Sequence, residues 1–398
     1  MRKAVILAAG EGKRLKPFTE SIPKVMMPVA NKPILEYVIN AVKKNGIHEI
    51  ILVVGYKKES IMDYFKDGKK FDVSIEYAVQ EKQLGTAHAL FQAKPFIDEE
   101  FLVLPGDNII DAESISLLCK DESEMALLVE YSSNPSKYGV VKIEDGLVKG
   151  ILEKPEKAEE SIISTGIYKL QPNIFKSIEE CLYNGKNDLT TAIDVFIKKG
   201  EEIKAIKGKG KWMDILYPWD LLSINGRVMQ NISPSTAGKI EKNVIIKGNV
   251  FVGKDSIIHS GCFISGPVII GEGCEIGPNV CIFPSTSIGN NVTVHPFSEL
   301  RNSVIMDDVF IDSHSKISHS VMGKGCRISS HFLTLVGKSM MYIENEIHEM
   351  DDLGCFIGDG CIIGGNVVVG EGKIIGKNCI IDSLKIINKD IPTESKVM

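Results

Sequence analysis

Two glycines, an arginine and a lysine follow a short apolar run near the amino terminus, in the stretch AVILAAGEGKRLKPFTESIPK. The run from Ala4 to Leu7 is continuous, as expected of a strand buried on both faces of a parallel sheet. Gly10 and Gly12 predict a turn whose backbone N–H groups can approach an anion, because no Cβ obstructs them. Arg14 and Lys24 would add positive charge to that turn. The pattern therefore favours phosphate binding.

Two familiar phosphate-binding templates do not fit this turn. The dinucleotide fingerprint requires a third glycine where the chain has Leu15. The phosphate loop requires Gly-Lys-Ser/Thr where the chain has Gly12, Lys13 and Arg14. A plain tight turn is the alternative for the glycine pair taken by itself, so the choice depends on residues further along the chain.

Further polar residues follow predicted strands or open predicted helices. Asp107 ends the hydrophobic strand in EFLVLPGDNII, at the carboxyl edge where open parallel sheets bind ligands. Gln80 and Gln83 precede a Gly85-Thr86 turn that opens a helix. Taken singly, each such residue is equally explained as a helix cap, a solvated charge or a turn residue. The remaining candidates, in chain order, are Gly139, Glu153, Lys154, Thr165, Gly166 and Asp214.

Strand-like and helix-like segments alternate up to about residue 225. The segments IHEIILVVGY, EFLVLPGDNII and EMALLVEYSS predict buried strands. The segment PILEYVINAVKKNG predicts an amphipathic helix that stops at Gly46. This alternation predicts an α/β domain over residues 1–225, with a mostly parallel sheet covered by helices on both faces. A polar stretch predicts a linker at 226–239.

From residue 240 an aliphatic side chain recurs at every sixth position. Ile240 to Leu300 keep this period without a miss, and Ile305 to Ile317 continue it after a slip of one residue. Ile357 to Ile387 resume it after an irregular insertion near 329–356. Neither a helix nor a flat sheet has this period. Hexapeptides predict a parallel β-helix over 240–398, with three short strands per coil and aliphatics stacked between coils.

Most of the nine cysteines belong to this repeat. No C-x-x-C pair is present, and six cysteines stand two residues before a repeat aliphatic, where a small side chain faces inward. We therefore expect core residues rather than metal ligands or disulfides. These six are Cys262, Cys274, Cys326, Cys355, Cys361 and Cys379.

Length, charge and hydropathy exclude several classes of protein. A chain of 398 residues can hold two or three domains. Its formal net charge of −6 and the lack of a basic face argue against a nucleic-acid partner. No apolar run approaches the roughly 20 residues of a membrane span, and the start lacks the features of a signal peptide. We expect a cytoplasmic protein without a membrane partner.

In this order, the motifs resemble those of the sugar-1-phosphate nucleotidylyltransferases. The family pattern L-A-A-G-x-G-x-R-L-x-P-x-T-x-x-x-P-K spans Leu7 to Lys24. The two-part chain, with W-x-D-I starting at Trp212, most resembles the archaeal bifunctional N-acetylglucosamine-1-phosphate uridylyltransferase/acetyltransferase-like proteins. The resemblance implies a Rossmann-like nucleotidylyltransferase domain followed by a left-handed parallel β-helix.

The resemblance implies an in-line attack of a sugar-phosphate oxygen on the α-phosphorus of a nucleoside triphosphate. Arg14 would hold the leaving phosphates, Lys24 would contact phosphate in the transition state, and Asp107 would share a Mg²⁺ ion with Asp214. The residues implied for nucleotide binding are Leu7, Ala8, Ala9, Gly10, Gly12, Gln80, Gly85 and Thr86. Those implied for the sugar and its phosphate are Gly139, Glu153, Lys154 and Thr165.

The chain departs from the family at several positions. Residues 164–166 are Ser-Thr-Gly where the family commonly has Asn-x-Gly, which leaves the sugar undefined. In the coil FIDSHSKISHSVMG, Ser313 takes the place of the acetyltransferase base, and His314 would point to the other face of a strand. Phe283 replaces a phosphate-binding arginine, and RISSHFLTLVGK replaces the acetyl-CoA segment. We predict that acetyl transfer is lost.

The sequence thus predicts Mg²⁺-dependent transfer of a nucleoside monophosphate, from UTP or dTTP, to glucose-1-phosphate or N-acetylglucosamine-1-phosphate. The β-helix would serve oligomerisation or regulation, as a homotrimer or a multiple of it. One alternative is a bifunctional enzyme that acetylates through His314 or His319. Another is a non-catalytic assembly or sensing module, as in some translation-initiation exchange-factor subunits. The four charges of Arg14, Lys24, Asp107 and Asp214 argue against that module.

Overall fold

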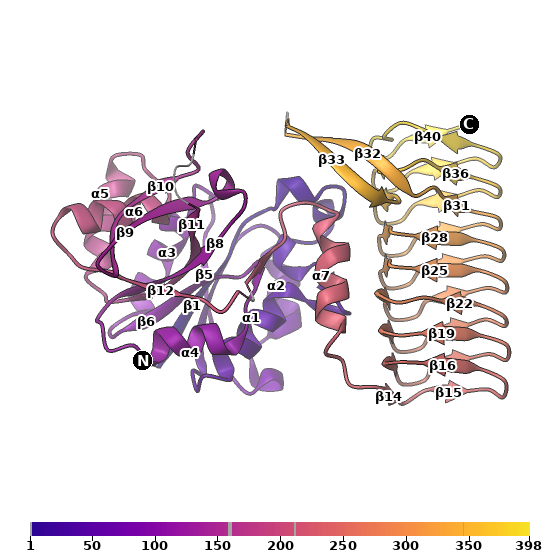
Figure 1. The fold of residues 1–398 in the computed structure, drawn as a ribbon, viewed down its shortest axis with the longest axis horizontal. Helices are drawn as coiled ribbons and strands as arrows, with labels where there is room; N and C mark the ends of the chain where they lie inside the picture. Colours follow the sequence, from indigo (N-terminus) through magenta and orange to yellow (C-terminus); the bar gives the residue numbers. More distant parts are fainter. Residues whose placement is uncertain (1, 158–160, 211, 345) are drawn as a thin grey trace. The chain divides into compact units, whose positions relative to one another are not determined.

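The computed structural model describes residues 2–157, 161–210, 212–344 and 346–398. The chain divides into two compact units (Figure 1). The first consists of Met1–Glu11, Pro23–Met26 and Ile34–Asp214, and the second of Gly12–Ile22, Met27–Pro33 and Ile215–Met398. Two segments near the amino terminus therefore pack with the carboxyl-terminal part of the chain. The domain limits at 225 and 240, with a linker between them, stay predictions.

A nine-stranded sheet forms the centre of the first unit, in the order β5-β4-β1-β6-β11-β8-β12-β10-β9. Four neighbouring strands run parallel: β5 (Ser74–Val79), β4 (Glu49–Val54), β1 (Lys3–Ala8) and β6 (Phe101–Pro105). The other five are of mixed direction: β11 (Ile162–Leu170), β8 (Ala126–Tyr131), β12 (Lys204–Lys207), β10 (Leu147–Glu153) and β9 (Gly139–Glu144). The predicted Rossmann-like sheet is confirmed, and its second part contains antiparallel pairs.

Two hydrophobic cores cover this sheet because successive side chains of a strand point to opposite faces. In β1, Ala4, Ile6 and Ala8 belong to one core and Val5 to the other. The first core includes residues of α1 (Ile34–Lys43), α2 (Lys58–Phe65) and α4 (Ala112–Lys120). The second includes α3 (Thr86–Gln92), α5 (Ile174–Tyr183) and α6 (Leu189–Lys198). Among the described residues, no helix is both long and apolar enough to cross a membrane.

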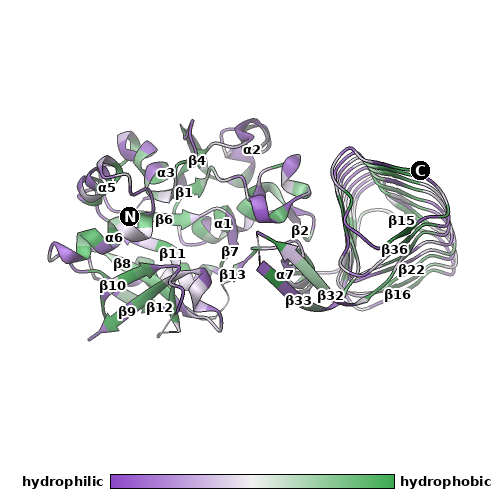
Figure 2. Cartoon of the chain, turned by 90° about the horizontal axis from the view of Figure 1, so that it is seen from above, coloured by the Kyte–Doolittle hydropathy of each residue, from purple (hydrophilic) through white to green (hydrophobic). Residues whose placement is uncertain are grey.

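The second unit is dominated by a left-handed parallel β-helix, as predicted, preceded by α7 (Asp220–Met229). Its three sheets run from β14 (Ser235–Thr236) to β37 (Ile374–Ile375), from β15 (Lys239–Ile240) to β40 (Lys396–Val397), and from β16 (Ile245–Lys247) to β39 (Ile386–Ile387). Figure 2 looks along the stacked coils. Ile258 pairs with Ile276, 18 residues later, whereas Val294 pairs with Ile311, 17 residues later. The shorter coils are the physical cause of the slip in the repeat.

The irregular insertion contains an antiparallel hairpin, formed by β32 (Gly337–Ile343) and β33 (Glu346–Leu353) (Figure 1). The β-helix continues beneath it, because β29 (Val321–Met322) pairs directly with β34 (Phe356–Ile357). The hairpin is thus an addition to one coil and does not interrupt the stack.

The six cysteines that precede repeat aliphatics are core residues of the β-helix, as predicted. All nine cysteines of the chain are free thiols, and the six that precede repeat aliphatics are buried. Burial raises the pKa of Cys355 to about 12, so this thiol is neutral at physiological pH. Disulfides and metal sites are therefore not needed to explain them.

Two adjacent isoleucines of β39 test how much the buried aliphatic side chains, which stack from coil to coil, stabilise the β-helix. Ile387 is 3% exposed, whereas Ile386 is 76% exposed. We predict that Ile387→Ala lowers the free energy of unfolding by about 2–5 kcal/mol, through lost burial and a residual cavity. Ile386→Ala should change it by less than about 0.5 kcal/mol. Urea denaturation of both variants measures this, and equal losses would contradict the stabilising role of these buried side chains.

Candidate active site

The loop after β1 is held between the ends of neighbouring strands. The Gly106 N–H donates to the Leu7 carbonyl at 2.8 Å, and the Tyr56 N–H donates to the Ala9 carbonyl at 3.0 Å. A Cβ built on Gly10 would meet no atom within 4 Å. The backbone at Gly10 therefore lies open to a ligand, as the phosphate-binding interpretation requires.

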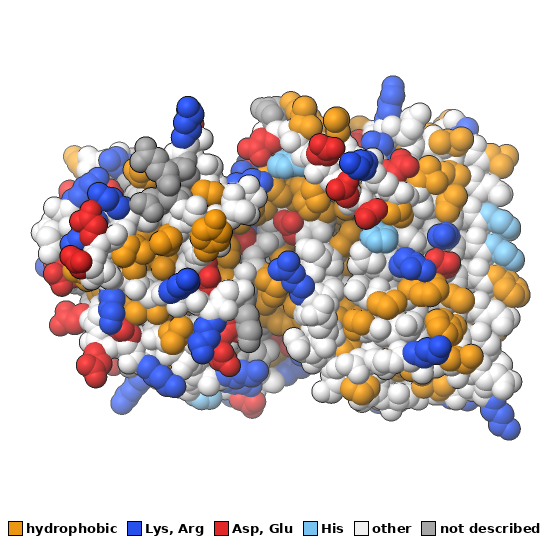
Figure 3. Space-filling view, in the orientation of Figure 1, with side chains coloured by type: hydrophobic (Ala, Val, Ile, Leu, Met, Phe, Trp, Pro, Cys, Tyr) orange, Lys and Arg blue, Asp and Glu red, His pale blue; other side chains and the backbone are white. Residues whose placement is uncertain are grey.

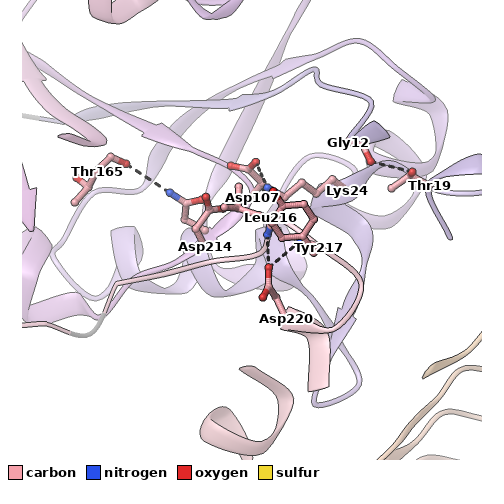
Figure 4. Close-up of polar contacts among 10 residues, drawn as sticks. Gly12, Thr19, Lys24, Asp107, Thr165, Asp214, Leu216, Tyr217 and Asp220 are labelled. Atoms are coloured by element: carbon pink, nitrogen blue, oxygen red, sulfur yellow. Dashed lines mark hydrogen bonds and ion pairs between the residues drawn. The ribbon is translucent and has the colours of Figure 1, made fainter. Parts of the chain in front are cut away.

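From Gly12 to Ile22 the loop belongs to the second unit and carries Arg14. Gly12 has a φ of 75°, in the left-handed region that glycine tolerates, and its carbonyl accepts from the Thr19 hydroxyl at 3.0 Å (Figure 4). Arg14 follows in a short helix, η1 (Lys13–Leu15). Its Nε donates to Glu344 Oε2 at 2.5 Å, and this hydrogen bond raises the pKa of Arg14. The guanidinium therefore already contacts an anionic group of the protein.

Lys24, Asp107 and Asp214 meet in the first unit, as Figure 4 shows. The Lys24 Nζ lies 2.6 Å from Asp107 Oδ2 and 3.3 Å from Asp214 Oδ1. Lys24 and Asp214 are only 12% and 11% exposed, whereas Asp107 is 33% exposed. Burial by itself would lower the pKa of Lys24, but the two carboxylates outweigh it and raise that pKa. Lys24 is therefore a fixed cation beside two acids.

A small two-stranded sheet brings the two acids together. Strand β7 (Asn108–Ile109) pairs antiparallel with β13 (Met213–Asp214), which places Asp214 opposite Asn108. Asp107 immediately precedes β7. These strands are two residues long, so they show no periodicity from which their pairing could be predicted.

Asn108 and Trp212 also belong to the site, although Trp212 was recognised from the sequence only as part of the W-x-D-I motif and Asn108 was not singled out. The Asn108 amide has one orientation that satisfies both of its ends. Its nitrogen then donates to Asp107 Oδ1 at 3.2 Å and Asp214 Oδ1 at 3.1 Å, and its oxygen accepts from Trp212 Nε1 at 2.9 Å. The opposite orientation offers only a 3.5 Å contact with the Thr165 carbonyl. Trp212 thus fixes the amide that links the two carboxylates.

The two carboxylates suit a divalent ion that also binds phosphate. Within the described ranges, no group of three or more His, Cys, Asp or Glu side chains is arranged to hold a metal. Asp107 and Asp214 are the residues that would hold such an ion, with phosphate oxygens and water as its other ligands. Mg²⁺ is commonly bound in this way, with one or two carboxylates and substrate phosphates.

The predicted base-binding residues lie around the start of α3. The Gln80 amide nitrogen donates to the Gly85 carbonyl at 3.0 Å and lies 2.9 Å from His88 Nδ1. The amide oxygen is therefore the atom left to accept a hydrogen bond from a ligand. The Thr86 hydroxyl oxygen accepts from the Leu189 N–H at 2.8 Å, which ties α3 to α6. A Cβ on Gly85 would approach a backbone carbonyl to 2.5 Å, so the turn requires glycine.

Three of the predicted sugar-binding residues lie together on β9 and at the end of β10. Gly139 and Glu153 are directly opposite each other in this antiparallel pair. Lys154 follows with a φ of 44°, and its Nζ lies 3.6 Å from Glu153 Oε1. A carboxylate and an exposed ammonium are thus presented side by side.

Thr165 does not present its side chain with the other three. It is buried, and its hydroxyl donates to the Leu128 carbonyl at 2.8 Å. An irregularity in β11 between Ser164 and Tyr168 changes the pairing with β8 and turns these side chains inward. The predicted contact between the Thr165 hydroxyl and the sugar is therefore not supported by its geometry.

The β-helix histidine considered as a shifted base lies at a coil corner. His314 is exposed, has a φ of 58° and stacks on His331 with ring centroids 4.9 Å apart. The expectation that strand alternation sets its direction was wrong, because the residue follows β27 (Phe310–Ile311) in a turn. The Arg301 guanidinium carbon lies 4.0 Å from the centroid of the Phe283 ring, so this phenylalanine packs against an arginine.

Three family models match successive parts of the chain. Residues 3–231 match the nucleotidyl transferase family, residues 264–341 match the GMPPB C-terminal domain, and residues 356–383 match the hexapeptide repeat of succinyl-transferase. These matches follow the division between the α/β sheet and the β-helix.

Two individual relatives are similar over part of the chain. Bifunctional protein GlmU of Methanococcus maripaludis strain C7 is 45% identical over 254 residues, which are 63% of this chain and 60% of that protein. The UTP–glucose-1-phosphate uridylyltransferase AglF of Haloferax volcanii is 36% identical over 242 residues, which are 59% of this chain and 99% of AglF.

A solved structure is similar to part of the chain. A Bacillus anthracis protein assigned as a glucose-1-phosphate thymidylyltransferase superposes with a TM-score of 0.54 and 26% identity, over 59% of this chain and 97% of that chain. Because the nucleotidyl transferase match covers more than half of the residues and nearly all of AglF is aligned, the chain belongs to the sugar-1-phosphate nucleotidylyltransferase family.

Proposed function

We propose that this protein transfers a nucleoside monophosphate from UTP or dTTP to a hexose-1-phosphate and releases pyrophosphate. The observation that carries the proposal is the nearly buried Lys24 ammonium between Asp107 and Asp214. A buried charge needs a partner, but two carboxylates on one lysine leave an acidic site that a divalent ion can neutralise. The activities for which AglF and the Bacillus anthracis protein are named support this chemistry.

The reaction makes specific electrostatic demands on the protein. An oxygen of the sugar phosphate attacks the α-phosphorus in line, and the bond from that phosphorus to the bridging oxygen of the β-phosphate breaks. Negative charge develops on the α-phosphoryl oxygens and on the departing pyrophosphate. Fixed cations and precise positioning therefore supply most of the catalysis.

The residues of the site divide this work. When bound, Mg²⁺ held by Asp107 and Asp214 would neutralise triphosphate charge. Lys24 provides a full positive charge to the α-phosphoryl oxygens, because its raised pKa keeps it protonated throughout the neutral range. Arg14 holds the leaving phosphates through charge-assisted hydrogen bonds. Asn108 keeps the two carboxylates side by side.

The Gln80 amide supports uracil or thymine over cytosine and adenine. With its nitrogen committed to Gly85, Gln80 offers an oxygen that accepts hydrogen bonds. The N3–H of uracil and thymine is a donor, whereas N3 of cytosine and N1 of adenine are acceptors that this oxygen repels. Glu153 and Lys154 bind sugar hydroxyls and the sugar phosphate, respectively.

The β-helix, we infer, assembles the protein into a homotrimer or a multiple of it. Ile362 and Ile380 are 49% and 36% exposed and pair directly in one sheet, so they form part of an outward apolar column. Such a column is a candidate interface between copies. We expect light scattering to give a multiple of three subunits, and the double variant Ile362→Lys/Ile380→Lys to dissociate it. A monomeric wild-type protein would contradict this assembly.

A pyrophosphate-release assay tests the proposed reaction. We expect Mg²⁺-dependent release with UTP or dTTP when glucose-1-phosphate or N-acetylglucosamine-1-phosphate is present. A grid that also includes ATP, CTP and GTP, each with and without the sugar phosphate, defines both substrates. Release that does not depend on any sugar phosphate, or no release in the whole grid, would refute the proposal.

The two carboxylates predict a strong effect of charge removal. We expect Asp107→Asn and Asp214→Asn each to lower kcat/KM by at least about 100-fold, because triphosphate charge is left uncompensated. Circular dichroism should show an intact fold. The matched control is Asp98→Asn, which removes a carboxylate that pairs with Lys3 at 2.8 Å on the surface. Near wild-type turnover of either site variant would contradict the metal assignment.

Trp212 predicts a subtler effect on the metal. We expect Trp212→Phe to raise the Mg²⁺ concentration for half-maximal activity by about three- to tenfold, because the Asn108 amide loses the donor that fixes it. Calorimetric titration with Mn²⁺ in the presence of UTP should show the same weakening. Trp219→Phe, which keeps a ring stacked on Tyr217, is the control. Unchanged metal affinity in Trp212→Phe would show that Asn108 is positioned without the indole.

A further inference from the structure

Arg14 is paired with a carboxylate that belongs to the hairpin inserted in the β-helix. Both residues lie in the second unit, where Arg14 Nε donates to Glu344 Oε2 at 2.5 Å. The side chains are 33% and 47% exposed, so water and ions reach the pair. Arg14 therefore has an anionic partner within the protein and is still accessible to a polyphosphate from solvent.

Packing within the second unit holds the hairpin beside Arg14. The Tyr217 hydroxyl donates to Glu346 Oε2 at 3.3 Å, and the His348 ring lies 4.4 Å from the Tyr217 ring and 5.3 Å from the Trp219 ring. The Arg14 guanidinium lies 5.9 Å from the same Tyr217 ring. Figure 3 shows acidic and apolar side chains gathered over the hairpin. Tyr217 thus contacts both the hairpin and Arg14, so the placement of Glu344 beside Arg14 does not depend on their ion pair alone.

The base of the hairpin is fixed by close packing on a coil of the β-helix. Met341 is buried, and a Cβ on Gly372 would approach Ser339 Oγ and Met341 Sδ to 2.5 and 2.7 Å. Glycine at this position lets the strand lie against the coil. The β-helix therefore determines where Glu344 is presented.

Arg14 also lines a cavity of about 330 Å³ in the second unit. Two further cations, Lys13 and Lys16, line the same cavity, together with the acids Glu20 and Asp390. Cations of one short segment are thus gathered where a polyanion could enter, and the protein already places carboxylates among them. The affinity of this cavity for an anion therefore depends on the attraction by the lysines and the arginine minus the repulsion by the carboxylates.

We propose that Glu344 is an internal competitor for polyphosphate at Arg14 and thereby sets the affinity for the nucleoside triphosphate and for pyrophosphate. The inference rests on the proposed function, which assigns the leaving phosphates to Arg14. Glu344 engages only Nε, so the other edge of the guanidinium can still meet phosphate. A phosphate bound there must either displace the carboxylate or accept its repulsion, and either event weakens binding.

The same pair would have a different effect if Glu344 only oriented Arg14 for catalysis. Loss of an orienting partner lowers kcat, whereas loss of a competitor tightens binding and leaves kcat nearly unchanged. The two roles therefore predict opposite results for one substitution.

The test is Glu344→Gln, which keeps the shape of the side chain and removes its charge. We expect the dissociation constant for inorganic pyrophosphate, measured with Mg²⁺ by calorimetry, and the KM for the triphosphate to fall about two- to fivefold, the range typical of exposed ion pairs. The change in kcat should stay within about twofold. The gain in affinity should shrink in 0.5 M salt, where exposed charges are screened.

The matched control is Glu349→Gln, which removes an equal charge from an exposed position of β33 in the same hairpin. Unchanged pyrophosphate affinity in this variant excludes an effect of net charge alone. Equal tightening in both variants would overturn the proposal.

An Arg14→Ala background separates this inference from the proposed function. We expect Arg14→Ala to weaken pyrophosphate binding, and Glu344→Gln to give no gain in that background. If Arg14→Ala weakens binding but Glu344→Gln alone changes nothing or lowers kcat, the competitor role fails and the proposed function stands. If Arg14→Ala leaves pyrophosphate binding unchanged, the assigned role of Arg14 in the proposed function fails, and the competitor role fails with it.

Discussion

The buried ammonium of Lys24 constrains the arrangement of the whole candidate site. A charge removed from water is tolerated only when partners compensate for its lost hydration. Asp107 and Asp214 supply this compensation from two short strands that pair with each other, and Asn108 bridges the two carboxylates. The group as a whole is acidic, because one lysine faces two carboxylates. It therefore compensates the lysine charge internally, and under the proposed function its excess negative charge would favour a divalent cation.

Under the proposed function, binding is an exchange of ionic partners. Asp107 and Asp214, which pair with Lys24, would be the residues that hold a divalent ion, and the Lys24 ammonium would share its charge between them and phosphate. The Arg14–Glu344 pair of the second unit follows the same principle. Each of these two cations is paired with carboxylates of the protein. The affinity for phosphate therefore equals the free energy of the cation–phosphate contact minus that of the cation–carboxylate contact it replaces.

Features set by local geometry could be predicted from the sequence. The six-residue period of the aliphatic side chains equals the length of one side of a three-sided coil. The one-residue slip corresponds to coils of 17 residues, as between Val294 and Ile311. The burial of β1 on both faces follows from its unbroken apolar run. The residue types of the site were also visible, because Lys24, Asp107 and Asp214 stand in a recognisable order.

Features that depend on tertiary contacts could not be predicted in this way. The pairing of β7 with β13 joins two dipeptides that carry no periodic signal, so the contacts of Asn108 and Trp212 at the site were missed. The resemblance assigned Thr165 to sugar binding, but the contact of its hydroxyl with the Leu128 carbonyl, beside an irregularity of β11, could not be predicted from the sequence. His314 was assigned a strand direction, but a corner with positive φ sets its orientation.

The hairpin shows how the β-helix can carry a regulatory element without losing its core. In a solenoid each coil contacts only its neighbours, so an insertion at a corner leaves the stack above and below it intact. The direct pairing of β29 with β34 shows that the coils on either side of the hairpin remain in contact. Within the hairpin, Met341 and His348 are paired on the inner face, whereas Tyr342 and Ile347 are exposed on the outer face. A strand pair with one buried face can place a charged tip reproducibly. The rigid β-helix is therefore a suitable support for presenting Glu344 to Arg14, a role that assembly alone would not require.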